Sequence, residues 1–129
     1  MKTIKMASLS LVLGLFVMLS AIVYAQDAAK LAPTVSQKVI LDNEKVRVIA
    51  VEFEPGATTD WHSHPNHVVY ALTDGKMEIT VKGKPANVVD LKAGTAMYLP
   101  SVTHMAKNIG TATVKMVVTE LKPAPAEKK

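Results

Sequence analysis

The sequence predicts an all-β fold, and three observations support that prediction. Short runs are rich in Val, Ile, Thr and Tyr, which are common in strands. Residues that favour turns interrupt these runs at intervals of roughly eight to ten residues. No segment after the first 25 residues shows sustained helical periodicity. Together these features are typical of a β-sandwich or β-barrel.

Nine strands are expected, each bounded by residues that favour a turn. Glycine adopts a positive φ, proline fixes φ, and Asn and Asp bond to nearby backbone, so these residues end a strand. The turns fall at Asp42-Asn43, Pro55-Gly56, Pro65, Asp74-Gly75, Gly83-Lys84-Pro85, Ala93-Gly94, Pro100 and Gly110. The strands between them, in chain order, are 36–42, 45–53, 59–64, 67–73, 76–82, 86–91, 95–99, 103–108 and 112–121.

Hydrophobic alternation supports the strand assignment. Residues 76–82 read Lys, Met, Glu, Ile, Thr, Val and Lys, so polar and apolar side chains alternate. Residues 114–118 place Val, Met and Val at every second position. Since successive side chains on a strand point to opposite faces, each of these strands is expected to bury one face and expose the other.

The N-terminal segment is typical of a secretory signal peptide. Lys2 and Lys5 precede a mostly apolar stretch over 6–24, and Ala25 provides a small residue at the cleavage position. We expect cleavage after Ala25, so that residues 1–25 are removed and the mature chain is periplasmic or secreted. The alternative is an uncleaved membrane anchor, because the apolar stretch is near the length that spans a bilayer.

Charge and cysteine content exclude several function classes. The 129-residue chain has a formal net charge of +4, but the leader holds two lysines and no acid, so its removal leaves +2. The remaining lysines alternate with acids and never form a basic run with interleaved aromatics, so nucleic acid is a poor candidate partner. The sequence contains no cysteine, which excludes disulfides, thiolate metal ligands and a cysteine nucleophile.

The mature chain has room for one domain. Residues 26–34 are Ala-rich and include a proline, and we expect them to form a flexible lead-in. Residues 122–129 contain only Pro, Ala, Glu and Lys, and we expect a disordered tail. The folded domain is therefore expected to span 35–121.

The four histidines are the main signal for function. His62, His64 and His67 lie within six residues, and His104 follows about forty residues later. Residues two apart on a strand point to the same face, so His62 and His64 can present two imidazoles to one ion. A His-x-His pair alone is more often a surface or hydrogen-bonded pair than a ligand set, so both interpretations stay open on spacing alone.

Two motifs around these histidines resemble those of the cupin superfamily. Pro55-Gly56, five residues, His62-Ser63-His64, then Tyr70 and Gly75 is similar to the first cupin motif. Gly94, five residues, Pro100, His104, three residues and Asn108 is similar to the second. The resemblance covers about 39–121 and implies a cupin-type double-stranded β-helix, or jelly-roll barrel. It also implies one divalent metal ion held by His62, His64 and His104.

The sequence departs from the family pattern at Val68. The first motif usually carries a glutamate ligand four residues after its second histidine, and Val68 stands at that place. The resemblance therefore implies three neutral histidine ligands with open positions for water or substrate. Such a set favours Fe, Zn, Ni, Cu or Mn without choosing among them. His67 and Asn66 remain alternatives for a further ligand, although strand alternation predicts that His67 points away from the ion.

Tyr70 is the candidate catalytic residue. It shares the parity of Val68, so its hydroxyl is placed to donate a hydrogen bond or a proton to a metal-bound substrate. The alternative is that the Tyr70 ring fills the barrel. Asp60 is expected in a turn or in solvent, and Arg47, the sole arginine, is expected to face solvent.

The fold alone does not name an activity, because one fold hosts many functions. Three classes remain. The first is a metal-dependent dioxygenase acting on a small anionic or chelating organic substrate. The second is a non-redox metal-dependent lyase or isomerase, which the loss of the glutamate weakens by removing the most obvious general base. The third is a non-catalytic periplasmic module that binds a metal or a ligand. Apolar strand faces would also allow a homodimer.

Overall fold

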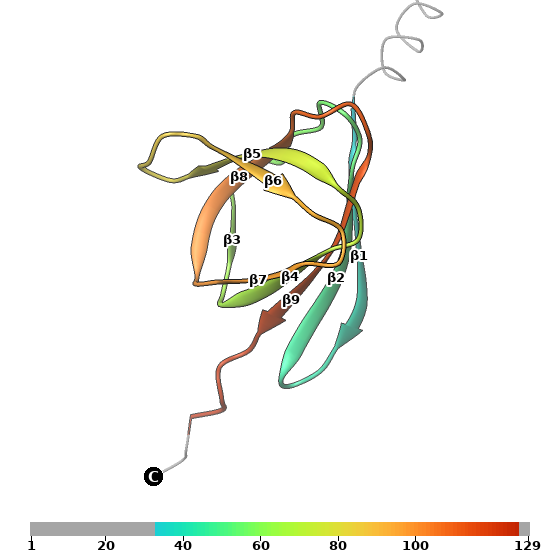
Figure 1. The fold of residues 1–129 in the computed structure, drawn as a ribbon. Helices are drawn as coiled ribbons and strands as arrows, with labels where there is room; N and C mark the ends of the chain where they lie inside the picture. The colour runs from blue at the N-terminus through green and yellow to red at the C-terminus, as the bar shows by residue number, and fades with distance from the viewer. Residues whose placement is uncertain (1–32, 127–129) are drawn as a thin grey trace, which may run out of the picture. The chain divides into compact units, whose positions relative to one another are not determined.

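The computed structural model describes residues 33–126, and its regular structure over that range consists of β-strands (Figure 1). No helix within this range is long and apolar enough to span a membrane. The expected signal peptide, residues 1–25, lies outside the described residues, as do 26–32 of the expected lead-in and 127–129 of the expected tail. The strands are β1 (Val35–Asp42), β2 (Val46–Phe53), β3 (His62–His64), β4 (His67–Ala71), β5 (Gly75–Val81), β6 (Asn87–Leu91), β7 (Ala96–Leu99), β8 (Val102–Asn108) and β9 (Val114–Leu121).

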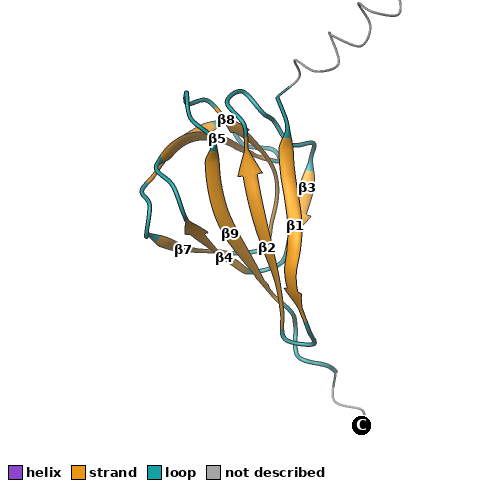
Figure 2. Ribbon diagram, turned by 90° about the vertical axis from the view of Figure 1, so that its right-hand side faces the viewer, coloured by secondary structure: helices purple, strands orange, loops and turns teal. Residues whose placement is uncertain are grey.

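The strands form two antiparallel sheets around a common interior (Figure 1). The larger sheet has the order β1-β2-β9-β4-β7, and the smaller sheet has the order β3-β8-β5-β6. Strands far apart in the sequence are neighbours: β2 pairs with β9 from Val46↔Leu121 to Phe53↔Val114, and Figure 2 shows β1, β2 and β9 side by side. A chain that alternates between two facing sheets in this way forms a jelly roll.

This architecture confirms the expected all-β double-stranded β-helix, and each expected strand is present within three residues of its expected bounds. The largest difference is β3, which was expected to begin at residue 59 and is only three residues long. Before it, Thr58 makes an isolated bridge with Lys107, and the Thr59 amide donates to the Ala106 carbonyl at 2.9 Å. The chain therefore runs beside β8 before β3 begins, but without a continuous ladder.

The core lies between the sheets and is built from alternate residues of each strand. In β9, Val114, Met116 and Val118 are buried, as the alternation predicts. The remaining buried apolar side chains are Ile49, Val51, Phe53, Ala57, Val69, Ala71, Met77, Leu91 and Ala106. Burial of this apolar set is the main stabilising contribution in a chain that has no cysteine for disulfides.

Asn108, which ends the second motif, links the two sheets. Its side chain is fully buried, and its Nδ2 donates to the carbonyl oxygens of Phe53 at 3.0 Å and Ala112 at 2.9 Å. Its Oδ1 accepts a hydrogen bond from the Gly110 amide at 2.9 Å. Because Asn108 belongs to β8 and Phe53 to β2, this one side chain links the two sheets and also holds the loop that follows β8, which is a structural role.

The outer face of the larger sheet carries exposed apolar side chains. Tyr70 on β4 is 43% exposed and Tyr98 on β7 is 61% exposed, and Val68 on β4 pairs with Tyr98. Contiguous apolar surface of this kind is a place where another protein surface can pack. The homodimer that the apolar strand faces would allow stays a prediction.

Candidate metal centre

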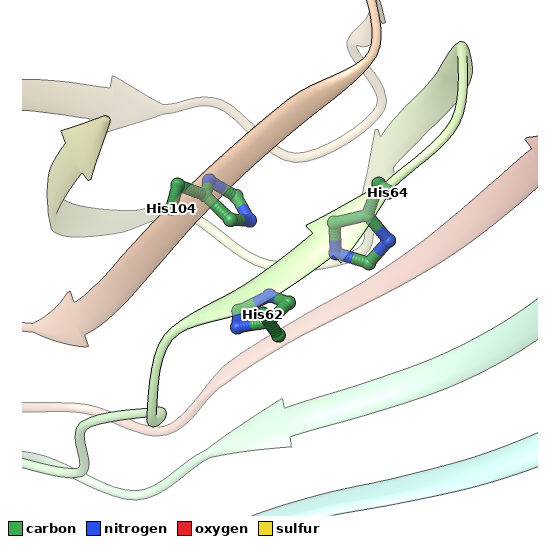
Figure 3. A group of neighbouring side chains, drawn as sticks. All are labelled: His62, His64 and His104. Atoms are coloured by element: carbon green, nitrogen blue, oxygen red, sulfur yellow. The ribbon is translucent and has the colours of Figure 1, made fainter. Parts of the chain in front are cut away.

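Two adjacent strands of the smaller sheet bring three histidines together. His62 and His64 lie two residues apart on β3, and His104 lies on β8 opposite His62 in the antiparallel register. One potential ligand nitrogen from each ring lies within 4.8 Å of the others. Figure 3 shows the three side chains gathered beside the two strands. The structure therefore assembles the three histidines that the sequence singled out.

Hydrogen bonds define which nitrogen is free in two of these rings. His62 Nδ1 donates to the carbonyl oxygen of Asp60 at 2.8 Å. His64 Nδ1 donates to Oε1 of the Glu120 carboxylate at 2.6 Å. Because both acceptors lack a proton to give, each neutral ring keeps its proton on Nδ1 and leaves a lone pair on Nε2. A lone pair with a fixed orientation is what a metal ion needs from histidine.

Burial favours the neutral form of the His64 and His104 rings. Desolvation lowers the pKa of His104 to about 4, and the neighbouring His62 and His64 add repulsion between like charges. Desolvation also lowers the pKa of His64, although its hydrogen bond to Glu120 acts in the opposite direction. Neutral imidazole is the form that binds metal, so His64 and His104 need not release a proton at neutral pH before they act as ligands.

The three nitrogens fit a divalent ion. Imidazole binds Zn²⁺ at about 2.0–2.1 Å, which places neighbouring ligand atoms roughly 3–3.5 Å apart. The nitrogens here lie within 4.8 Å of one another, so binding one ion would require the rings to approach by roughly an ångström. Three protein ligands leave coordination positions open, as in catalytic rather than structural metal sites. The site could therefore hold an ion and a small ligand together.

Glu120 is a residue of the site that the sequence analysis missed. It lies on β9 in the larger sheet, is 8% exposed, and holds His64 through the 2.6 Å hydrogen bond. Its Oε2 lies 3.6 Å from Nη1 of Arg47, whose side chain is 44% exposed and partly faces solvent, as expected. The signal was present in the sequence, because Glu120 continues the inward row of Val118, where a charged residue needs a partner.

The predicted orientation of β4 was wrong. His67 and Val69 face the interior and are buried, whereas Val68 and Tyr70 lie on the outer face. The physical reason is that β3 belongs to the smaller sheet and β4 to the larger one, so alternation counted from His64 does not continue across the turn between them. Val69, rather than Val68, presents apolar carbon to the cavity.

This correction changes the places of His67 and Tyr70. His67 is 1% exposed, its ring centroid lies 4.8 Å from that of His64, and its Nδ1 donates to the Pro65 carbonyl at 2.8 Å. It lies in the cavity wall but outside the cluster of three ligand nitrogens. Tyr70 is absent from the cavity wall, so the structure gives no support to its predicted role as a proton donor.

The two other polar candidates take part in hydrogen bonds at the edge of the site. Asp60 is exposed, as expected, and contributes its backbone oxygen to His62. Asn66, considered as a further ligand, accepts a hydrogen bond on Oδ1 from the Ser101 amide at 2.9 Å. Asn66 therefore orders the turn that precedes β4.

The histidines face an apolar cavity of about 410 Å³ between the two sheets. All four histidines of the chain contribute to its wall. Most of the other lining side chains are aliphatic or methionine, and no aspartate or glutamate of residues 33–126 lines it. The arrangement is a group of potential metal ligands beside a largely apolar cavity, which is the usual composition of a small-molecule site.

Fold and site together define a class of protein: a small jelly-roll barrel whose interior carries three imidazoles that could hold a divalent ion. The family model for the cupin domain matches residues 49–120, which is more than half of the chain. The chain therefore belongs to the cupin family.

Several solved structures similar to this chain are also described as cupins. A cupin domain from Bordetella pertussis Tohama I is 29% identical with a TM-score of 0.67, and the match covers 71% of this chain and 97% of that one. A cupin-like protein from Thermotoga maritima is 31% identical with a TM-score of 0.53, covering 70% and 71%. An RmlC-like cupin family protein from Methanocaldococcus jannaschii, described as a double-stranded β-helix, is 19% identical with a TM-score of 0.58, covering 70% and 83%; it supports the fold alone. No curated protein matches the chain.

Proposed function

We propose that this cupin binds one divalent ion through His62, His64 and His104 and uses it as a dioxygenase on a small chelating organic substrate. The observation that carries the proposal is the cluster of three histidine nitrogens within 4.8 Å at the wall of an apolar cavity. Two of the rings have their Nδ1 protons committed to acceptors, which leaves Nε2 for the ion.

The neutral ligand set supports an anionic or chelating substrate. Three neutral imidazoles leave the full +2 charge of the ion uncompensated, so an enolate or a similar bidentate anion is attracted to the open positions. When bound, a redox-active ion such as Fe(II) supplies the electron transfer that allows dioxygen to react with an organic molecule. The aliphatic walls keep water away from that reaction.

The cavity wall favours the oxygenase over the non-redox lyase or isomerase. Proton transfer to or from a substrate needs a positioned acid or base, and no carboxylate among the described residues lines the cavity. His67, the one lining histidine outside the proposed ligand set, already donates its Nδ1 proton to the Pro65 carbonyl. Glu120 is a buried carboxylate beside the site, but its oxygens already interact with His64 and Arg47, so it is not free to act as a general base. An oxygenase needs less from the wall, because dioxygen and the ion provide the reactive groups.

Metal analysis of the purified protein tests the first step of the proposal. We expect one divalent ion per chain, and we expect His62→Ala, His64→Ala and His104→Ala each to remove it. His67→Ala is the matched control, since its ring lies in the same wall but outside the ligand cluster. If His67→Ala removed the metal as completely as His64→Ala, the three-histidine site would be wrong.

Oxygen consumption tests the reaction class. The Fe(II)-loaded protein is expected to consume dioxygen in the presence of a β-dicarbonyl compound, and His104→Ala is expected to consume none. Turnover of a chelating substrate without oxygen uptake would support the lyase or isomerase instead. Retention of the ion without any turnover across such substrates would support the non-catalytic binding module.

A further inference from the structure

We infer that the ligand of this cavity consists of a compact apolar body with a single chelating head, and that polyhydroxylated molecules such as sugars are poor ligands. The inference rests on the proposed metal site for the head, but the body is recognised by the walls alone. It names the substrate class that the proposed function leaves open.

Both sheets contribute apolar side chains to the cavity wall. On the larger sheet the inward rows of β2, β4, β7 and β9 face the cavity, and on the smaller sheet those of β5, β6 and β8 do so. Val69 and Val118 from the larger sheet and Met77 and Ile79 from the smaller sheet are representative. A molecule that enters this space meets hydrocarbon and thioether on both sides.

Polar groups in the wall outside the histidines are few and poorly placed to bind a hydroxyl-rich body. Thr59 already accepts from the Ala106 amide at 2.9 Å and lies 3.4 Å from the Ala106 carbonyl. Gln37 lies on β1, an edge strand of the larger sheet. Lys84, in the connection between β5 and β6, and Asn87, the first residue of β6, are exposed. The polar groups that remain for a bound molecule are therefore concentrated at the histidine cluster.

This distribution discriminates between ligand classes. A sugar carries a hydroxyl on almost every carbon, and each hydroxyl that loses water without gaining a partner lowers affinity. An apolar body gains affinity in the same place, in proportion to the area it buries. The cavity of about 410 Å³ has the volume of roughly 14 water molecules. That space accommodates a phenyl ring or a short branched alkyl group together with its chelating head.

Two probes with the same head and different bodies test the inference. Acetohydroxamic acid and benzohydroxamic acid present identical chelating groups, one on a methyl group and the other on a phenyl ring. With Zn²⁺-loaded protein, calorimetric titration is expected to show benzohydroxamic acid binding at least tenfold more tightly. Equal affinities, or tighter binding of a monosaccharide such as glucose than of acetohydroxamic acid, would overturn the inference.

Adjacent valines on β4 provide a matched pair of variants. Val69→Thr places a hydroxyl in the cavity wall with little change in volume and is expected to reduce the preference for the phenyl ring several-fold while retaining the metal. Val68→Thr makes the same change on the outer face and is expected to leave the preference unchanged. Should Val69→Thr fail to fold, Val118→Thr on β9 makes the equivalent change from the same sheet. An unchanged preference in both wall variants would refute recognition by these walls.

A metal-free measurement separates failure of this inference from failure of the proposed function. Toluene has an apolar body and no chelating head, so its binding, followed by methyl chemical shifts, does not depend on an ion. We expect toluene to shift the methyl signals of lining residues such as Val69 and Val118, and not that of Val68. If the protein bound no metal but bound toluene, the metal centre would be wrong and the apolar site would stand. If the protein bound the metal but did not bind toluene and showed no preference for the phenyl ring, the metal centre would stand and the apolar site would be wrong.

Discussion

Replacing Glu120 with leucine is expected to weaken metal binding through its effect on His64. Oε1 of Glu120 accepts the His64 Nδ1 proton at 2.6 Å, and the side chain is only 8% exposed. Leucine removes the hydrogen-bond acceptor and fills the buried position with an apolar side chain of similar size. Without that acceptor the His64 ring can place its proton on Nε2, and this tautomer offers no lone pair to the ion in the same orientation.

The expected loss of metal affinity follows from the hydrogen bond between Glu120 and His64. Loss of a hydrogen-bond partner behind a histidine ligand weakens metal affinity by about 10- to 100-fold, which corresponds to about 1.4–2.7 kcal/mol. We expect Glu120→Leu near the upper end of this range, because burial leaves no water to replace the carboxylate. Glu120→Gln should lie near the lower end, since its amide oxygen can still accept from Nδ1. His64→Ala removes the ligand itself and should exceed both.

Competition titration of Zn²⁺ against a chromophoric chelator at neutral pH measures these affinities. The matched control is Glu52→Gln, because Glu52 is a glutamate on β2 that pairs with Lys115 at the surface and is about half exposed. It carries the same charge change without contact to a histidine. An affinity of Glu120→Leu close to that of the parent protein would refute the orienting role. Equal losses in Glu52→Gln and Glu120→Gln would show a general effect of charge.

Four further outcomes are expected. The metal-free protein should lose thermal stability as the pH falls from about 6.5 to about 4. Folding lowers the pKa of His104 from 6.5 to about 4, so the unfolded chain takes up the proton first. Thermal melts across this pH range check the expectation, and His104→Gln should reduce the dependence of stability on pH. Asn108→Ala removes three hydrogen bonds at a fully buried position and should lower the free energy of unfolding by about 3 kcal/mol; chemical denaturation measures it, with the exposed Asn87→Ala as control. Intact-mass analysis of exported protein should show cleavage after Ala25, whereas a mass that retains the leader in the membrane fraction would indicate an anchored protein. Light scattering should show a homodimer that Tyr98→Glu on the outer face dissociates, and an unchanged mass for that variant would exclude this face as the interface.

The barrel was predictable because its signals are local. Most strand boundaries lie within a few positions of turn residues, the start of β3 being the exception, and Gly56 and Gly94 adopt positive φ angles of 81° and 82° at two such turns. The pairing of His62 and His64 on one face was equally local, because the pleat fixes the relation between residues two apart on one strand. Such local relations between residues are the same in any fold that contains the strand, so they can be predicted from the sequence.

The errors concern relations between strands. The orientation of His67 and Tyr70 depends on the crossing from the smaller to the larger sheet, which alternation within a strand does not contain. The contact between His64 and Glu120 joins residues 56 positions apart and exists because β4 and β9 are neighbours, with His67 opposite Glu120. Alternation in β9 indicates that Glu120 points inward, but its partner His64 follows from the topology of the whole chain, for which a single sequence gives no local signal.

The shortness of β3 makes it the most weakly paired strand of the proposed metal site. β3 has three residues and pairs only with β8 at the edge of its sheet, so few backbone hydrogen bonds hold it in place. Segments held in this way open at a small free-energy cost and are the first to exchange amide hydrogens or to be cut by proteases. An ion on His62, His64 and His104 would join β3 to β8, and its binding would make local opening of β3 less frequent by mass action. If the proposed ion is bound, the metal-free protein should therefore be cut at β3 faster than the loaded protein, which limited proteolysis would measure.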